Sequence, residues 1–178
     1  MTDAGLVVTL ANARSDRRPS HARARVTHDG LADPVAAGQL LAPFVGEPVE
    51  ARELPTLRAI QRAVVAIVDA LIDGTPAPVD ALNALAEREP LVSALEPGTD
   101  GRLRSRLRPR RDSVTGAVLV TLLRQLGELD PGRLRRCERS ECRLAFYDTT
   151  RSGTQRWHAE RPCGLRERQD RHRARTET

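Results

Sequence analysis

The sequence predicts a mainly α protein of the α+β class, with a helical N-terminal part, one β-hairpin and a small C-terminal module. Three observations predict it. Apolar residues recur at spacings of three and four over residues 57–71 and 114–126, which is the period of an amphipathic helix. Two short runs, residues 91–95 and 102–107, flank a turn rich in Pro, Gly and Asp, which is typical of a β-hairpin. All three cysteines of the chain lie within residues 137–163.

Charge and turn chemistry divide the chain at residues 129–132, Leu-Asp-Pro-Gly. Residues 1–132 hold 16 Arg against 17 acidic residues, whereas residues 133–175 hold 13 Arg against 6. We therefore expect a mostly helical domain over residues 1–131 and a basic module over residues 132–178. A neutral body with a basic end indicates either an anionic partner for that end or a solvated tail.

The first thirty residues contain one apolar run and one polar stretch. Residues 6–13 form either a buried strand or the start of a helix, because a run of this length does not distinguish them. Residues 14–30 are predicted to be an exposed loop. His21 and His28 lie in it without a paired ligand nearby, so we expect them to be surface residues.

The next helix is predicted to begin at Asp33 and Pro34, because Asp is a favoured N-cap residue and Pro suits the first helical position. Pro43 and the Gly-Glu-Pro run of residues 46–48 end it. We expect it to present Val35, Leu40, Leu41 and Phe44 as its apolar positions.

A longer core helix is predicted from its N-cap residue, Thr56, to a stop at Gly74. A rigid link over residues 75–78 leads to a short helix over residues 79–88. The inward residues of the long helix are Leu57, Ile60, Val64, Ile67, Val68 and Leu71, and those of the short helix are Val79, Leu82 and Leu85.

The second strand of the hairpin alternates Leu103, Ser105 and Leu107 with arginines. Its arginine face is either a solvated face of the sheet or a second basic patch that helps hold a phosphate backbone. The patch would comprise Arg102, Arg104, Arg106, Arg108, Arg110 and Arg111. Asp112 or Ser113 then caps a helix whose stripe is Val114, Ala117, Val118, Leu122, Leu123 and Leu126.

The cysteines and one histidine form two close pairs. Four residues separate Cys137 from Cys142, four separate His158 from Cys163, and fifteen lie between the pairs. Zinc prefers four tetrahedral nitrogen or sulfur ligands, and a pair near a tight turn presents two of them without long-range folding. We therefore predict one zinc site made by Cys137, Cys142, His158 and Cys163.

Other interpretations of these four residues stay open. Unrelated buried thiols would make the paired spacing a coincidence. A disulfide requires an oxidising compartment and would leave one thiol over. A catalytic zinc keeps one coordination position open to water, whereas four protein ligands favour a closed, structural site.

Residues 133–175 resemble the CGNR zinc finger family in the order and spacing of their motifs. The resemblance rests on a leading Arg-Leu-rich strand, the C-x4-C knuckle, a strand that carries Phe146, Tyr147 and Asp148, an Arg-Trp step, and a Cys-Gly pair that opens a basic helix. It implies nucleic-acid binding linked to transcription regulation.

Two residues depart from the family pattern. His158 stands where the family usually has a cysteine, which keeps a zinc ligand but makes the site less anionic. Leu165 stands where the Cys-Gly-Asn-Arg signature has Asn, so any polar contact of that side chain is lost.

The N-terminal part is similar to the ABATE domain, which commonly precedes a CGNR finger. The likeness rests on residues 10–13, Leu-Ala-Asn-Ala, on residues 81–85, Ala-Leu-Asn-Ala-Leu, on the hairpin and on the helix before the finger. It implies a stress-linked transcription regulator.

The finger is expected to be treble-clef-like, with a knuckle, a hairpin and a helix joined by zinc. Residues 144–148 and 155–158 would form the hairpin, and Cys163 would start the terminal helix, with Phe146, Tyr147 and Trp157 as a small core. Arg168, Arg171 and Arg175 are placed on one helix face, with Arg166 and Arg173 on an adjoining one. The nucleic-acid-binding residues would be Arg151, Arg156, Arg166, Arg168, Arg171, Arg173 and Arg175.

These patterns predict a zinc-dependent DNA-binding protein that regulates transcription. The alternatives are a zinc-stabilised module that binds an acidic protein, and an RNA-binding module whose aromatic side chains stack on bases. An enzyme is not expected, because the chain has no Lys, no G-x-S-x-G, no H-E-x-x-H and no Gly-rich phosphate loop. We expect a cytoplasmic protein with no membrane span, and a symmetric homodimer is the default for a regulator.

Overall fold

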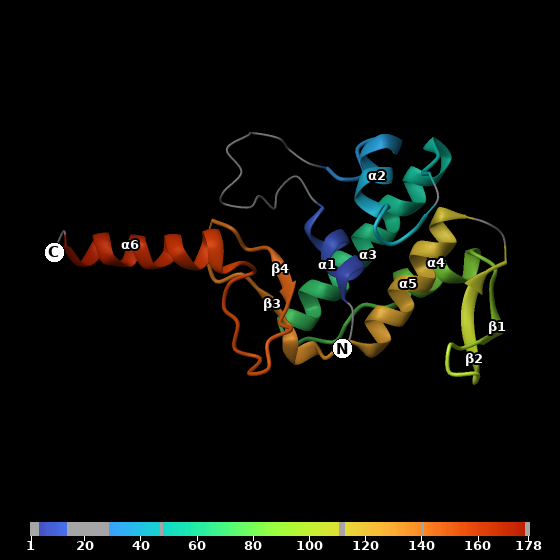
Figure 1. The fold of residues 1–178 in the computed structure, drawn as a ribbon. Coiled ribbons are helices and arrows are strands. Elements are labelled where there is room, and N and C mark those ends of the chain that lie inside the picture. Colours follow the sequence, from blue (N-terminus) through green and yellow to red (C-terminus); the bar gives the residue numbers. More distant parts are fainter. Residues whose placement is uncertain (1–3, 14–28, 47, 111–112, 140, 177–178) are drawn as a thin grey trace.

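The computed structural model describes residues 4–13, 29–46, 48–110, 113–139 and 141–176. It confirms a mainly α fold with two small two-stranded sheets (Figure 1). The elements are α1 (Gly5–Asn12), α2 (Pro34–Leu41), α3 (Leu54–Ile72), α4 (Asp80–Arg88), β1 (Leu91–Pro97), β2 (Leu103–Pro109), α5 (Val114–Glu128), β3 (Leu134–Arg136), β4 (Ala145–Tyr147) and α6 (Leu165–Thr176). The predicted surface residues His21 and His28 lie outside the described residues, as do Arg111 and Asp112.

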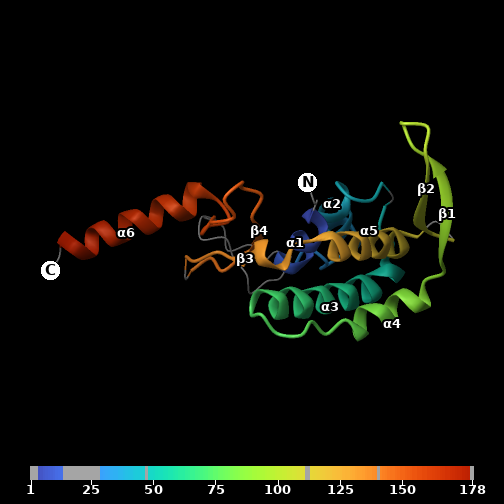
Figure 2. The same cartoon turned by 90° about the horizontal axis from the view of Figure 1, so that it is seen from below.

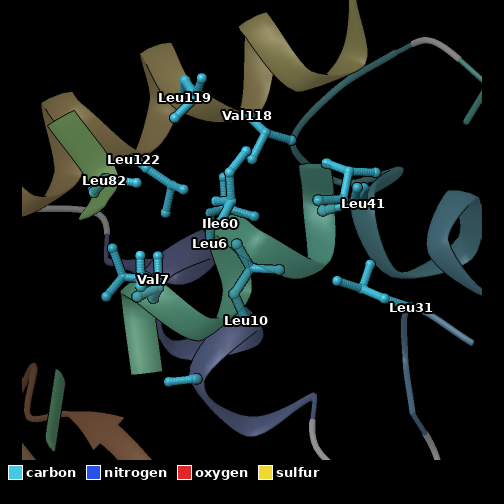
Figure 3. Packing of buried hydrophobic residues seen from close by; sticks show 14 of the residues in the cluster. Leu6, Val7, Leu10, Leu31, Leu41, Ile60, Leu82, Val118, Leu119 and Leu122 are labelled. Carbon is cyan, nitrogen blue, oxygen red and sulfur yellow. The ribbon is translucent and has the colours of Figure 1, made fainter. Parts of the chain in front are cut away.

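The first apolar run is a helix, α1, which lies at the centre of the molecule against α3, α5 and β4 (Figures 1 and 2). Leu6, Val7 and Leu10 are fully buried and point among the apolar side chains of α3 and α5 (Figure 3). Because α1 is enclosed on several sides, its sequence is apolar nearly all round, and no helical period appears in it.

Side chains from the neighbouring helices cap both ends of α1. The buried Gln125 of α5 accepts hydrogen bonds from the backbone N–H groups of Leu6 and Val7, at 3.0 and 3.1 Å. Gln61 of α3 donates to the carbonyl oxygen of Ala13 at 2.8 Å. These bonds satisfy helix-end groups that are buried away from water and would otherwise be costly to leave unpaired.

The two long helices follow the predicted stripes, but α3 begins earlier than expected. Thr56 is not its N-cap, because the helix already begins at Leu54, after a 3-10 turn in which Glu50 and Glu53 form a capping box. Gly74 ends it with a φ of 68°, as predicted. Ser113 is confirmed as the N-cap of α5 and accepts from the N–H of Gly116.

Of the apolar positions named for the two shorter helices, Val35 and Val79 are exposed, and the inward position predicted for Val79 is wrong. Val35 is 69% exposed, because Ala37 and Leu41 define the buried face of α2 and Val35 lies on the other side of so short a helix. Val79 is 44% exposed, since α4 begins one residue later and turns Leu82 inward. Asp33 caps α2 as predicted, accepting from the N–H of Ala36 at 2.9 Å.

The hairpin of β1 and β2 is confirmed and extends from the end of the helical body (Figures 1 and 2). Its arginine face is exposed, which fits both a solvated face and a basic patch, and the Leu-bearing face is exposed too: Leu103 is 68% and Leu107 is 41% exposed. Within the described residues the strand pair has no third strand. Alternation in the sequence therefore does not predict burial of the leucines, because it does not show whether another element covers the apolar face of the hairpin.

The sheet of the C-terminal module pairs β4 with β3, not with residues 155–158. The cysteine knuckle itself connects these two strands, and residues 155–158 are not a strand. Leu134 and Ala145 belong to the core of the helical body, and Tyr147 packs against it. The expectation of a separate aromatic core is thus wrong in part: of the three aromatic residues, Trp157 is the one that packs on the cysteines, together with Leu144.

Asn12, at the end of α1, ties this sheet to the body. Its side-chain nitrogen donates to the carbonyl oxygen of Ala145 at 2.8 Å, and its side-chain oxygen accepts from the Ala145 N–H at 2.9 Å. The amide therefore pairs with β4 as a further strand would. Within the described part of the chain, no helix combines the length and the apolar composition that a membrane span requires.

Replacing Asn12 by Ala should lower the free energy of unfolding by about 2–4 kcal/mol, because the N–H and C=O of Ala145 would be left buried and unpaired. Urea unfolding of the zinc-loaded protein measures this. Asn83→Ala is the control, since Asn83 is exposed on α4 and its replacement should be neutral or slightly stabilising. Equal stability of the two variants would contradict the role of Asn12.

Candidate metal centre and the basic helix

The four predicted ligands converge on one point. Cys137, Cys142, His158 and Cys163 each offer a ligand atom, and these atoms lie within 4.8 Å of one another. The Nδ1 atom of His158 is 3.3 Å from the Cys142 sulfur and 3.6 Å from the Cys163 sulfur. Tetrahedral zinc with ordinary bond lengths requires ligand–ligand separations of about 3.5–3.8 Å, so the arrangement fits zinc.

Backbone hydrogen bonds shape the first ligand pair. The N–H of Cys137 donates to the carbonyl oxygen of Leu144 at 2.8 Å, and the N–H of Cys142 donates to that of Arg139 at 2.9 Å. Arg143 closes the knuckle with a φ of 49°, a left-handed conformation that is uncommon outside glycine. The N–H of Glu138 donates to the carbonyl oxygen of Arg156 at 3.0 Å, so the segment that precedes His158 supports the knuckle as well.

The protein environment disfavours the charged form of the first two thiols. Burial raises the pKa of Cys142 to about 12 and also raises the pKa of Cys137. Backbone N–H groups of Arg139 and His158 hydrogen bond to the Cys137 sulfur and partly offset the effect of burial. A dication reverses this balance, because a thiol that coordinates zinc gives up its proton.

The centre is closed. All three cysteines are buried and His158 is half-buried, and protein atoms supply all four positions of a tetrahedron. Such a site leaves no position for a substrate or an activated water, which is the arrangement of structural zinc.

Three contacts hold the start of α6 beside this centre. Cys163 stands two residues before the helix, so one ligand pins its N-terminus. Gly164 follows in close packing, because a Cβ there would come within 3.0 Å of the Trp157 ring and closer still to the Glu160 carboxylate. The buried Arg139 donates to Asp170 of α6 at 3.0 Å and to Glu141 at 2.7 Å.

Among the described elements, α6 is in extensive contact only with residues 160–164 at its start, and Arg139 reaches it at Asp170. It has no buried residue, and Figures 1 and 2 show it extending away from the rest of the molecule. Its direction therefore depends on the zinc ligand and on Arg139 rather than on an apolar face.

Two of the predicted arginines lie over the Trp157 ring. The guanidinium carbon of Arg156 lies 5.2 Å from the ring centre and that of Arg168 lies 5.8 Å from it. Each is also paired with a glutamate, Arg156 with Glu138 at 2.7 Å and Arg168 with Glu160. The hydrogen bond from Arg156 holds the pKa of Glu138 below its usual value.

The remaining predicted arginines lie on or near α6. Arg171 pairs with Glu167 at 3.3 Å, whereas Arg151, Arg173 and Arg175 are exposed. The expected adjoining position of Arg166 and Arg173 is wrong. At about 100° per residue they lie on the side of the helix opposite to Arg168, Arg171 and Arg175.

The roles of Arg139 and Glu138 and the contacts of Asp148 are not predicted by the sequence. Asp148 is fully buried; its carboxylate accepts from the hydroxyl and N–H of Thr150 and from the N–H of Gln155, and the hydroxyl bond lowers its pKa. It thereby holds the turn that leads to His158. In the sequence, the Asp-Thr-Thr run of residues 148–150 is the one signal that could have indicated this turn. Nothing in the sequence distinguishes Arg139 from the other arginines.

Residues 133–176 match the CGNR zinc finger family. The match spans the two strands, the four ligands and α6, which we call the finger from here on. Together with the ligand geometry it identifies a zinc-binding finger with one structural zinc. None of the curated proteins compared with the chain matches it. The likeness of residues 1–131 to the ABATE domain stays a prediction.

His158→Ala should reduce bound zinc from one per chain to well below one, because three ligands leave a coordination position open. His158→Cys should retain one zinc per chain, because a thiolate is the ligand that the family usually has there. Metal analysis after dialysis measures both. Retention of full zinc by His158→Ala would contradict the four-ligand site.

Proposed function

We propose that this protein binds DNA through α6 of the finger and acts as a transcription regulator without catalysing a reaction. One observation carries the proposal: an arginine-rich helix projects from the body with no buried residue while its start is held at the zinc centre. A 12-residue helix without a packed face is only marginally stable alone, so a partner surface would stabilise it.

The dimensions of α6 suit the DNA major groove. Twelve residues span about 18 Å, and a helix with its side chains is about 10–12 Å wide, close to the width of the groove. Arg168, Arg171 and Arg175 line one side of the helix, and Arg166 and Arg173 line the other. Arginines on both sides can therefore reach the phosphates of both strands.

The zinc centre matters for this function because it orients the helix. A helix enters the groove only when its direction relative to the body is fixed. Cys163 and the Arg139–Asp170 ion pair provide that constraint here. Arg156, beside Arg168 on the Trp157 ring, would extend the phosphate contact to the start of α6.

The RNA alternative is not favoured by the positions of the aromatic rings. Phe146 is buried, Tyr147 packs on the body, and Trp157 lies between the cysteines and two guanidinium groups. None of these side chains is presented as a free platform for base stacking. An acidic protein partner would use the same charges as DNA and is distinguished by experiment.

Zinc-loaded protein should bind genomic DNA fragments with an affinity that falls as salt rises, with a log–log slope of about −0.9 per phosphate contacted. Arg171→Ala/Arg175→Ala should flatten that slope by about 2, because two phosphate contacts are lost. Arg88→Ala/Arg110→Ala is the control; it removes two exposed charges at the other end of the body and should leave the slope unchanged.

Enrichment of a few fragments by the zinc-loaded protein, and its loss in Cys137→Ala/Cys142→Ala, would support a sequence-specific regulator. Uniform binding with a steep salt dependence would mean that α6 contacts phosphates only. Absence of binding near physiological salt would contradict the proposal and favour an acidic protein partner.

Glu138→Gln should tighten DNA binding and steepen the salt slope by up to about 0.9, because Arg156 no longer pairs with an internal carboxylate. Glu141→Gln is the matched control. Glu141 lies on the same knuckle but pairs with the buried Arg139, which cannot reach DNA. If both variants steepen the slope equally, Arg156 does not contact phosphate.

A further inference from the structure

The hairpin carries an apolar face that nothing in the described structure covers. Of the six large apolar residues that are exposed among the described residues, Leu95, Leu103 and Leu107 lie here, and the first two are 69% and 68% exposed. In the strand register Leu95 pairs with Ser105, and Leu103 with Pro97, so these side chains share one face. A two-stranded hairpin with an uncovered apolar face is marginally stable by itself.

The two edges of this hairpin differ in position. β2 lies against α5, and β1 forms the outer edge, away from the helical body (Figure 1). The N–H of Gly98 donates to the carbonyl oxygen of Arg102 at 2.7 Å. The N–H of Arg110 donates to the carbonyl oxygen of Pro90, also at 2.7 Å. Hydrogen-bonded pairs alternate along an antiparallel ladder. The backbone N–H and C=O groups of the even-numbered residues of β1 are therefore directed toward β2. Leu91, Ser93 and Leu95 therefore direct their backbone groups outward.

The two edges also differ in charge. β2 carries three arginines, Arg104, Arg106 and Arg108. If β2 paired antiparallel with β2 of a second copy in a register centred on Arg106, the two Arg106 residues would lie opposite each other and Arg104 would lie opposite Arg108. Like charges directly opposite are destabilising, which protects that edge. β1 has one charged residue, Glu96, and its edge lacks this protection.

Antiparallel pairing of β1 with its own copy is self-complementary. When the register is centred on Ala94, Glu96 lies opposite Val92 of the other copy and no like charges meet. The outward backbone groups of Ser93 then meet those of Leu95, which is the alternation that a ladder requires. Pro97, at the end of the strand, still offers its carbonyl oxygen to Leu91.

We propose that the protein forms a symmetric dimer in which β1 pairs antiparallel with β1 of a second copy. The result is one four-stranded sheet in the order β2-β1-β1-β2, with the leucines of both hairpins on one continuous face. The interface is isologous, as in most symmetric dimers. Because α6 lies at the other end of each molecule, the two fingers stand at opposite ends of the dimer (Figures 1 and 2).

Sedimentation of the zinc-loaded full chain over a wide range of concentration tests this. The native protein should show twice the monomer mass, and Leu95→Pro should lose the dimer because it removes an outward N–H. Ser105→Pro is the matched control: Ser105 pairs directly with Leu95 but faces the edge of β2, so its dimer should persist. A monomer at every concentration, or equal masses of the two variants, would overturn the proposal.

A cross-linking test does not depend on the proline variants folding. In the proposed register the two Ala94 residues are a non-hydrogen-bonded pair with Cα atoms about 4.5 Å apart, a separation that a disulfide spans. Zinc-loaded Ala94→Cys should form a covalent dimer on mild oxidation, whereas Arg106→Cys, directly across the hairpin, should not. Equal cross-linking of the two cysteine variants would place the contact elsewhere and overturn the proposal. A dimer mass without cross-linking of either variant would do the same. Binding of another protein's peptide at the β1 edge, in place of a second copy, would also overturn it.

Discussion

Four ligand atoms from the knuckle, from His158 and from Cys163 hold the C-terminal part of this protein together. Structural zinc in such a module contributes apparent binding free energies of about 10–16 kcal/mol. That contribution matters here because α6 has no apolar face to bury and cannot be oriented by packing. The direction of the arginines therefore follows from metal coordination, helped by the close approach at Gly164 and by the Arg139–Asp170 ion pair.

The finger is joined to the helical body through α1, which packs on β4, and through α3, whose Asp69 pairs with Arg136 of β3 at 3.2 Å. This short helix is buried, so the polar groups at its ends require partners from elsewhere in the chain. Gln125 and Gln61 supply them within the body, and Asn12 pairs with Ala145 on β4. The same helix thus contributes to the apolar core and to the sheet that carries the knuckle. Its burial explains why Leu134, Ala145 and Tyr147 of the finger belong to the core of the body, while the finger's own cluster is the three cysteines with Leu144 and Trp157.

The two surfaces for which we propose partners, α6 and the β1–β2 hairpin, lie at opposite ends of the molecule (Figure 2). α6 is mostly polar and carries five arginines against Glu167 and Asp170, which suits an anionic surface. The hairpin has an apolar face and one edge with little charge, which suits a strand of a second copy. The second basic patch, on the other face of this hairpin, is therefore remote from α6, and a short DNA segment held by α6 would not reach it.

The sequence by itself determined the local features: the spacing of the zinc ligands, the stripes of α3 and α5, the caps at Asp33 and Ser113, and the turn at Gly74. Each depends on residues close together in the chain, where propensity and period act directly. The tertiary structure decided that β4 pairs with β3, that α1 is a helix, and that Val35 and the hairpin leucines are exposed. These outcomes depend on which surfaces meet across long sequence separations, and the period of a single segment carries no information about its partner.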